Sequence, residues 1–155
     1  MNFSQQRGFT LIEILVVITI LVTLSAVSVT VFSKFSTSRA LTGSVQTVLS
    51  ILDDARTLTL ASKDGYQYGV HFETTKVVLF KGTVYSSSDS DNDITVLQTT
   101  VEISNITLTG SGSDVVFSRL TGKTAQNGTV RLSLVSDSTS SSTINIQTTG
   151  IAEVN

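Results

Sequence analysis

The sequence predicts an α+β fold, in which one long N-terminal helix packs on a C-terminal antiparallel β-sheet domain. Two patterns of apolar residues along the 155-residue chain support this prediction. Residues 9–32 are almost continuously apolar, and residues 33–62 keep apolar residues at three- and four-residue steps, which is typical of helices. From Tyr66 onward apolar and polar residues alternate, which is typical of half-buried strands.

The first half of the predicted helix is long enough to span a membrane. The segment "FTLIEILVVITILVTLSAVSVTVF" occupies residues 9–32 and would be roughly 36 Å long as a helix. A bilayer core is about 30 Å thick, so we expect a single membrane-spanning helix here. Its Thr and Ser hydroxyls can bond to carbonyls of their own helix, which makes them tolerable in lipid.

The second half, residues 33–62, is predicted to be an amphipathic helix that packs on the sheet. Asp53 and Asp54 fall outside the apolar stripe and are expected on the solvated surface. Lys63, Asp64 and Gly65 supply a stop for the helix. The stripe consists of Leu41, Val45, Val48, Leu49, Leu52, Ala55 and Leu58.

The remaining residues predict six to eight strands. "YQYGVHFE" and "KVVLFKG" form an expected hairpin, and "DITVLQTTVEI", "NITLT", "DVVFSRL" and "AQNGTVRLSLV" continue the strand pattern. "STINIQTTGIAEV" suggests a final hairpin around Thr149 and Gly150. The polar segments "YSSSDSDND", "GSGSD" and "SDSTSSST" are predicted loops.

The apolar run contains one acid, Glu13, which limits how its N-terminus can be interpreted. A cleaved secretory signal peptide would have an apolar region of about 7–15 residues, shorter than this one and without an acid. An ordinary uncleaved anchor accounts for the length but not for the acid. A third interpretation is cleavage after Gly8, because the new amine at Phe9 would stand one helical turn before Glu13 and could pair with it or with the acid of a neighbouring copy.

The segment "RGFTLIEILVVITIL" resembles the class III leader and N-terminal helix of type IV pilins and type II secretion pseudopilins. The resemblance implies that a prepilin peptidase cuts after Gly8 and methylates the new N-terminal residue, Phe9. It also implies that Glu13 is the residue that guides assembly with other pilin or pseudopilin subunits. Many members of the family have a proline in this helix, whereas the present chain contains none.

Weaker patterns further along the chain are similar to the GspH/FimT-type minor pseudopilins. These patterns are "DGYQYGVHF", "VVFSRLTG", "VRLSLV" and "INIQTTG". The resemblance implies a minor subunit of a type II secretion pseudopilus or a type IV pilus-like filament, anchored once in the cytoplasmic membrane with its C-terminal domain outside. Two alternatives stay open, namely a DNA-uptake minor pilin and a membrane-anchored β-domain adhesion module that joins no filament.

Together these observations divide the chain into four parts. We expect residues 1–8 to be a cleaved leader, residues 9–32 the membrane and assembly helix, residues 33–62 the amphipathic half of the helix, and residues 63–155 a β-rich globular domain.

Neither the composition nor the motifs of the chain support an enzyme. The chain has no Cys, so thiolate metal sites and cysteine nucleophiles are excluded. His71 is its only histidine and is expected at the surface, opposite the apolar face of its strand. Zinc-protease and serine-hydrolase motifs are absent. The sequence therefore predicts a structural protein without a cofactor.

Two binding activities receive weaker support. Asp89, Asp91 and Asp93 alternate in one polar segment and are a weak candidate for a calcium site, since the glycine and glutamate of an EF-hand loop are missing. DNA uptake in FimT-like proteins is tied, by resemblance, to arginines in the C-terminal tail. The tail "TGIAEVN" contains Glu153 and no arginine, so we expect no nucleic-acid binding.

Overall fold

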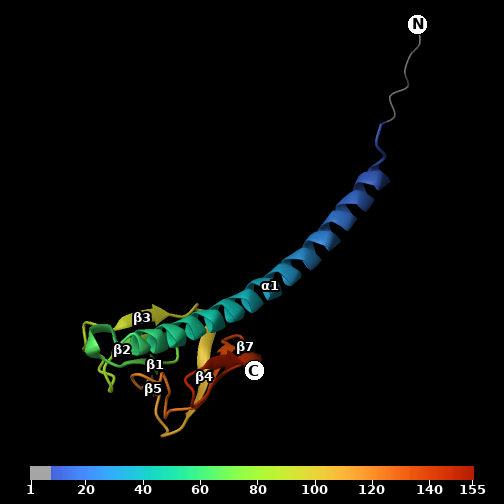
Figure 1. Cartoon of the computed structure of the whole chain (residues 1–155). Coiled ribbons are helices and arrows are strands. Elements are labelled where there is room, and N and C mark those ends of the chain that lie inside the picture. Colours follow the sequence, from blue (N-terminus) through green and yellow to red (C-terminus); the bar gives the residue numbers. More distant parts are fainter. Residues whose placement is uncertain (1–7) are drawn as a thin grey trace. The chain divides into compact units, whose positions relative to one another are not determined.

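The computed structural model describes the backbone of residues 8–155 and, within that range, every side chain except those of residues 27–34. It confirms the predicted α+β class, with one helix and antiparallel strands (Figure 1). Contacts divide the chain into a first unit that ends at Ser36 and a second unit, Thr37–Asn155. The elements are α1 (Leu11–Leu60), the 3₁₀ turn η1 (Lys63–Gly65), β1 (Tyr68–Phe72), β2 (Lys76–Lys81), β3 (Asp93–Val96), β4 (Val101–Leu108), β5 (Asp114–Val116), β6 (Gly128–Leu134), β7 (Asp137–Ile146) and β8 (Ala152–Val154).

Helix α1 ends where the sequence predicts a stop. Its last residue is Leu60, and the backbone then turns with positive φ at Ser62 (47°), Asp64 (54°) and Gly65 (76°). Left-handed conformations cannot continue a right-handed helix, so this run of three separates α1 from β1.

The strands form two four-stranded sheets instead of one. One sheet has the order β3-β2-β1-β5 and the other β4-β6-β7-β8. The predicted β1–β2 and β7–β8 hairpins are confirmed, the second closed by the Gly150 N–H to Gln147 carbonyl bond of 2.9 Å.

Two strand boundaries differ from the prediction. "DITVLQTTVEI" is split between β3 and β4, which belong to different sheets. The predicted loop "SDSTSSST" is mostly strand, because β7 begins at Asp137 and pairs with β6. Its serines are held by pairing with a neighbouring strand, and Arg131 of β6 donates to the Ser141 hydroxyl at 2.7 Å. Polar residues thus join a strand when its partner supplies the hydrogen bonds.

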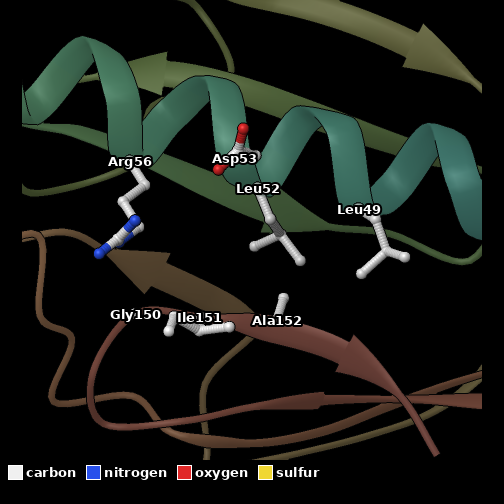
Figure 2. A pocket seen from close by; sticks show the side chains of 7 residues that line it. All are labelled: Leu49, Leu52, Asp53, Arg56, Gly150, Ile151 and Ala152. Atoms are coloured by element: carbon white, nitrogen blue, oxygen red, sulfur yellow. The ribbon is translucent and has the colours of Figure 1, made fainter.

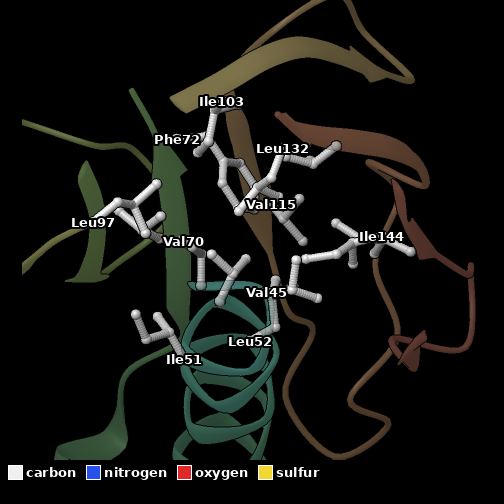
Figure 3. Close-up of a cluster of buried hydrophobic side chains, with 14 of the residues drawn as sticks. Val45, Ile51, Leu52, Val70, Phe72, Leu97, Ile103, Val115, Leu132 and Ile144 are labelled. Atoms are coloured by element: carbon white, nitrogen blue, oxygen red, sulfur yellow. The ribbon is translucent and has the colours of Figure 1, made fainter. Parts of the chain in front are cut away.

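The core lies between the second half of α1 and both sheets, all within the second unit (Figure 3). The predicted stripe is confirmed. Val45, Val48, Leu52 and Ala55 are buried, while Leu41, Leu49 and Leu58 are partly buried against the core. Asp53 and Asp54 are exposed, as predicted. The sheets contribute Val70, Phe72, Val77, Val115, Val130, Leu132, Ile144 and Ile146, and Phe117 directly after β5 is buried with them.

A buried hydroxyl joins the end of α1 to β1. The Thr59 Oγ1 atom accepts the Tyr68 N–H at 2.9 Å and donates to the Ala55 carbonyl at 2.8 Å. Thr59 is fully buried, so without its hydroxyl the Tyr68 amide would lose its partner away from water.

We predict that Thr59→Val lowers the free energy of unfolding by about 1–3 kcal/mol, the usual cost of an unsatisfied buried donor. Thr59→Ser keeps the hydroxyl and should lose less. Guanidinium unfolding of the detergent-solubilised chain, followed by circular dichroism, measures both. Equal losses in the two variants would contradict this account.

The tip of the β6–β7 hairpin is organised by one carboxylate. Asp137 accepts the Thr139 hydroxyl at 2.6 Å, the Ser140 hydroxyl at 2.8 Å and the Thr139 N–H at 3.1 Å. These hydrogen bonds favour the ionised form and lower the pKa of Asp137 below its ordinary value of 3.8.

The order of this tip should therefore depend on pH. A carboxyl whose pKa is depressed by folding contributes its stability above the unfolded pKa of 3.8 and loses it as the pH falls through the lower folded value. Hydrogen exchange at the Thr139 amide should speed up over that acidic range, beyond the intrinsic pH effect. In Asp137→Asn the same amide should show no such step, and a step that persists in this variant would refute the assignment.

Candidate functional site: the start of the N-terminal helix

The first turn of α1 is capped by Thr10. The Thr10 Oγ1 atom accepts the Glu13 N–H at 3.3 Å, and the helix begins at Leu11. Thr10 is thus the N-cap residue and Glu13 the third residue of the helix, the spacing of a capping box. A carboxylate in the first turn also lies at the positive end of the helix dipole. The helix dipole thus favours an acid here, while the hydrogen bond to Thr10 involves only the Glu13 backbone N–H.

The side chains that follow are apolar on every side of the helix. All large apolar residues from Phe9 to Leu24 in the described part of the first unit are about half exposed or more. Phe9, Leu11, Ile14, Leu15 and Ile18, together with Thr10, form a shallow, open and mostly apolar surface.

The hydroxyls inside this apolar surface are satisfied within the helix, as predicted. Thr19 donates to the Leu15 carbonyl at 2.8 Å, and Ser25 donates to the Leu21 carbonyl at 2.7 Å. Thr23 donates to the Ile20 carbonyl at 2.9 Å. Such bonds remove the need for water at these side chains.

Among the residues that the structure describes, no helix meets the length and hydropathy needed to cross a membrane. The membrane span expected for residues 9–32 stays a prediction.

The fixed spacing of Gly8, Phe9 and Glu13 before an apolar helix is the feature that a comparison with known families can test. Residues 3–29 match the family model of the prokaryotic N-terminal methylation motif. This motif is a type IV pilin-like signal, and it contains all three predicted site residues. No curated protein and no solved structure matches the chain.

The structure places two of the three motif residues at the exposed start of the chain's described part. Gly8 has open space around it, and the Phe9 side chain is 80 % exposed. Arg7, which precedes the predicted cut, lies outside the described residues. Cleavage after Gly8, methylation of Phe9 and the assembly role of Glu13 remain predictions about residues within the methylation motif.

Sequence reasoning missed Thr10. The signal was present, because Thr10 and Glu13 have the S/T-x-x-E spacing directly before an apolar run. The sequence explained Glu13 only by the charge of its side chain. The structure adds that its backbone N–H donates to the Thr10 hydroxyl and so helps to cap the helix.

The weak calcium candidate is not a preformed site in the described part of the chain. No three acidic, histidine or cysteine side chains there cluster as metal ligands. Asp91 lies 3.5 Å from the Lys81 ammonium, and the Asp89 carboxylate accepts the Asp91 N–H at 3.0 Å. Calcium binding stays a prediction.

His71 lies on the predicted face of its strand but is less exposed than expected. Its side chain is only 19 % exposed, because the Tyr85 ring stacks on the imidazole with a centroid distance of 3.8 Å. The imidazole also hydrogen-bonds Asp114 of β5. Tyr85 further contacts Phe80, so His71 belongs to a small cluster on the face of its sheet opposite the core.

A cavity of about 80 Å³ lies between α1 and the start of β8 (Figure 2). Leu49, Leu52, Ile151 and Ala152 supply apolar walls, and Gly150 completes the lining. Two charged residues, Asp53 and Arg56, also line it. Ligand pockets usually measure about 300–1,000 Å³, so this cavity is sized for a single side chain. The nearby tail residue Glu153 accepts a hydrogen bond from Gln147 at 2.7 Å.

Proposed function

We propose that the chain is a minor pilin or pseudopilin, a structural subunit that joins a type II secretion pseudopilus or a type IV pilus-like filament and takes part in protein secretion. The observation that carries the proposal is the match of residues 3–29 to the methylation motif. Gly8, Phe9 and Glu13 lie within these residues, at or just before the start of a helix whose large side chains up to Leu24 are apolar and exposed. The GspH/FimT-like subclass belongs to the proposal, supported by the strand patterns of the C-terminal domain.

In this proposal a prepilin peptidase removes residues 1–8 and methylates the Phe9 amine. Residues 9–32 hold the subunit in the cytoplasmic membrane with the β domain outside. A carboxylate in lipid costs at least about 2.5–3.5 kcal/mol, so Glu13 gains by meeting an amine. The Phe9 amine of a neighbouring subunit supplies that partner and sets the register between helices.

Assembly then exchanges lipid contacts for helix contacts along the apolar surface of α1. The large exposed side chains between Phe9 and Leu24 support this step, because they present apolar surface along the described start of α1. The proposal requires no cofactor and no catalytic residue.

The first test is the mass of the mature N-terminus. We expect a chain that starts at Phe9 and carries one methyl group, and we expect Gly8→Ala to accumulate as the longer precursor. Mass spectrometry of the membrane fraction reads both. A chain that keeps its first eight residues in cells with an active prepilin peptidase would rule the proposal out and favour the membrane-anchored adhesion module.

The second test separates the charge of Glu13 from helix capping. Glu13→Gln removes the charge and keeps a side chain suited to the capping box, whereas Thr10→Ala removes the cap and keeps the charge. We expect Glu13→Gln to lower incorporation into filaments by about tenfold or more, which corresponds to about 1.4 kcal/mol. Thr10→Ala should fray the first turn, at about 0.5–2 kcal/mol, and still be incorporated.

The readout is the fraction of each variant in sheared filaments, with total protein from immunoblots as the control. Wild-type incorporation of Glu13→Gln together with failure of Thr10→Ala would assign the motif acid to capping alone.

DNA uptake remains the alternative within the same class. The acidic Glu153 in the tail argues against it. A salt-sensitive mobility shift with micromolar protein would favour it over a secretion role.

A further inference from the structure

The C-terminal domain contains two acceptor motifs for an N-linked sugar. Such a motif is Asn, any residue except Pro, then Ser or Thr, and in an exported protein it marks a surface position. It occurs as "NIT" at residues 105–107 and as "NGT" at residues 127–129. A further "NFS", residues 2–4, belongs to the predicted leader and lies outside the described residues. The fold treats the first two motifs differently.

A β-bulge in β4 turns the first motif toward solvent. Ile103 is buried in the core, so strict alternation along the strand would also bury Asn105 and Thr107. The register with β6 shifts between Ile103 and Asn105, which leaves Ser104 as one extra residue. Alternation then resumes in the opposite phase. Leu108 is buried in the core, whereas Asn105 and Thr107 are exposed.

The bulge also brings the two side chains of the motif together. The Ser104 hydroxyl donates to the Arg131 carbonyl of β6 at 3.3 Å, which holds the extra residue in place. Arg131 is the cross-strand neighbour of Asn105, but its guanidinium donates to the Ser141 hydroxyl of β7. Asn105 Nδ2 instead donates to Thr107 Oγ1 at 3.3 Å. The amide and the hydroxyl that the motif requires thus lie side by side on an exposed face.

The second motif is held inside the packed start of β6. Asn127 is partly buried, and its Oδ1 atom accepts the Thr109 hydroxyl at 3.1 Å. Its backbone carbonyl accepts the Thr109 N–H at 2.9 Å. Backbones approach closely here, since a Cβ atom on Gly128 would lie 2.0 Å from the Thr107 carbonyl oxygen. β6 also has β4 and β7 on its two sides. A bulky sugar on Asn127 would have to break these contacts, whereas one on Asn105 extends into solvent.

We propose that Asn105 carries an N-linked glycan. The donor class is a sugar held on a polyprenyl diphosphate. Asn105 Nδ2 forms a bond to C1 of the sugar while the bond from C1 to the diphosphate oxygen breaks. The diphosphate leaves with the electron pair, and the amide nitrogen loses one proton. Because the acceptor motif is used in exported chains, this inference rests on the export of the β domain in the proposed function.

The position gives the glycan a use in a crowded assembly. Among the described strands, β4 pairs with β6 alone and is an edge of its sheet. An edge strand is prone to pair with strands of other chains, and proteins protect such edges with bulges, charges or covering groups. A bulky, soluble group at Asn105 covers the part of β4 that follows the bulge.

Mass spectrometry of the full chain from the membrane fraction of its native host tests the assignment. Trypsin cuts after Lys and Arg, so it separates the two motifs into peptides 82–119 and 124–131. We expect peptide 82–119 to carry the mass of one or more sugar residues, which electron-transfer fragmentation places on Asn105. Peptide 124–131 should be unmodified and serves as the internal control.

The same digest keeps this inference apart from the proposed function, because it also contains the N-terminal peptide. A methylated Phe9 together with unmodified Asn105 overturns the glycan and leaves the filament subunit standing. Added mass on Asn127, or only on serines and threonines of peptide 82–119, likewise overturns the assignment to Asn105.

Four variants test the motif without disturbing the core, since the altered side chains are exposed or partly buried. Asn105→Gln and Thr107→Val should each lose the modification, whereas Thr107→Ser keeps the hydroxyl and should retain it. The matched control Asn127→Gln should be modified like the wild type. The readout is the shifted band on an immunoblot of the full chain. A shift that persists in Thr107→Val, or that disappears in Asn127→Gln, contradicts the proposal.

Discussion

The fold depends on burial of one stripe of α1 between two sheets. Val48, Leu52 and Ala55 are almost inaccessible to solvent, and residues of both sheets surround them (Figure 3). A four-stranded sheet that is apolar on one face needs a cover for that face, and a helix needs a partner for its stripe. One helical segment meets this need for both sheets. The cavity beside β8 also lies against this segment.

Periodicity made the elements predictable. The stripe from Leu41 to Leu58 and the alternation after Tyr66 set the α+β class, because side-chain spacing reflects which face is buried. The division of the strands into two sheets was not predictable, since "DITVLQTTVEI" reads as one strand. The polar start of β7 was also missed, because its residues are held by pairing with β6 and not by burial. Long-range pairing leaves little trace in a local pattern.

In the candidate sites too, features formed by neighbouring residues could be predicted, whereas features that join distant residues could not. Gly8, Phe9 and Glu13 follow from a short motif, and the family comparison finds that motif at residues 3–29. The capping role of Thr10 could have been predicted from the sequence, since its hydroxyl accepts a hydrogen bond from a residue only three positions later. The cavity beside β8 could not have been predicted from the sequence, because its walls come from α1 and from residues about a hundred positions later. The stacking of Tyr85 on His71 joins residues fourteen positions apart through a polar loop, and it turns an expected surface imidazole into a covered one.

The hydroxyls of Thr19, Thr23 and Ser25 give the proposed assembly a particular thermodynamic character. Because each is already bonded to a carbonyl of its own helix, moving it from lipid to a neighbouring helix requires no dehydration and gains no new hydrogen bond. These three side chains therefore add little to the free energy of that exchange, which packing of the apolar side chains has to supply.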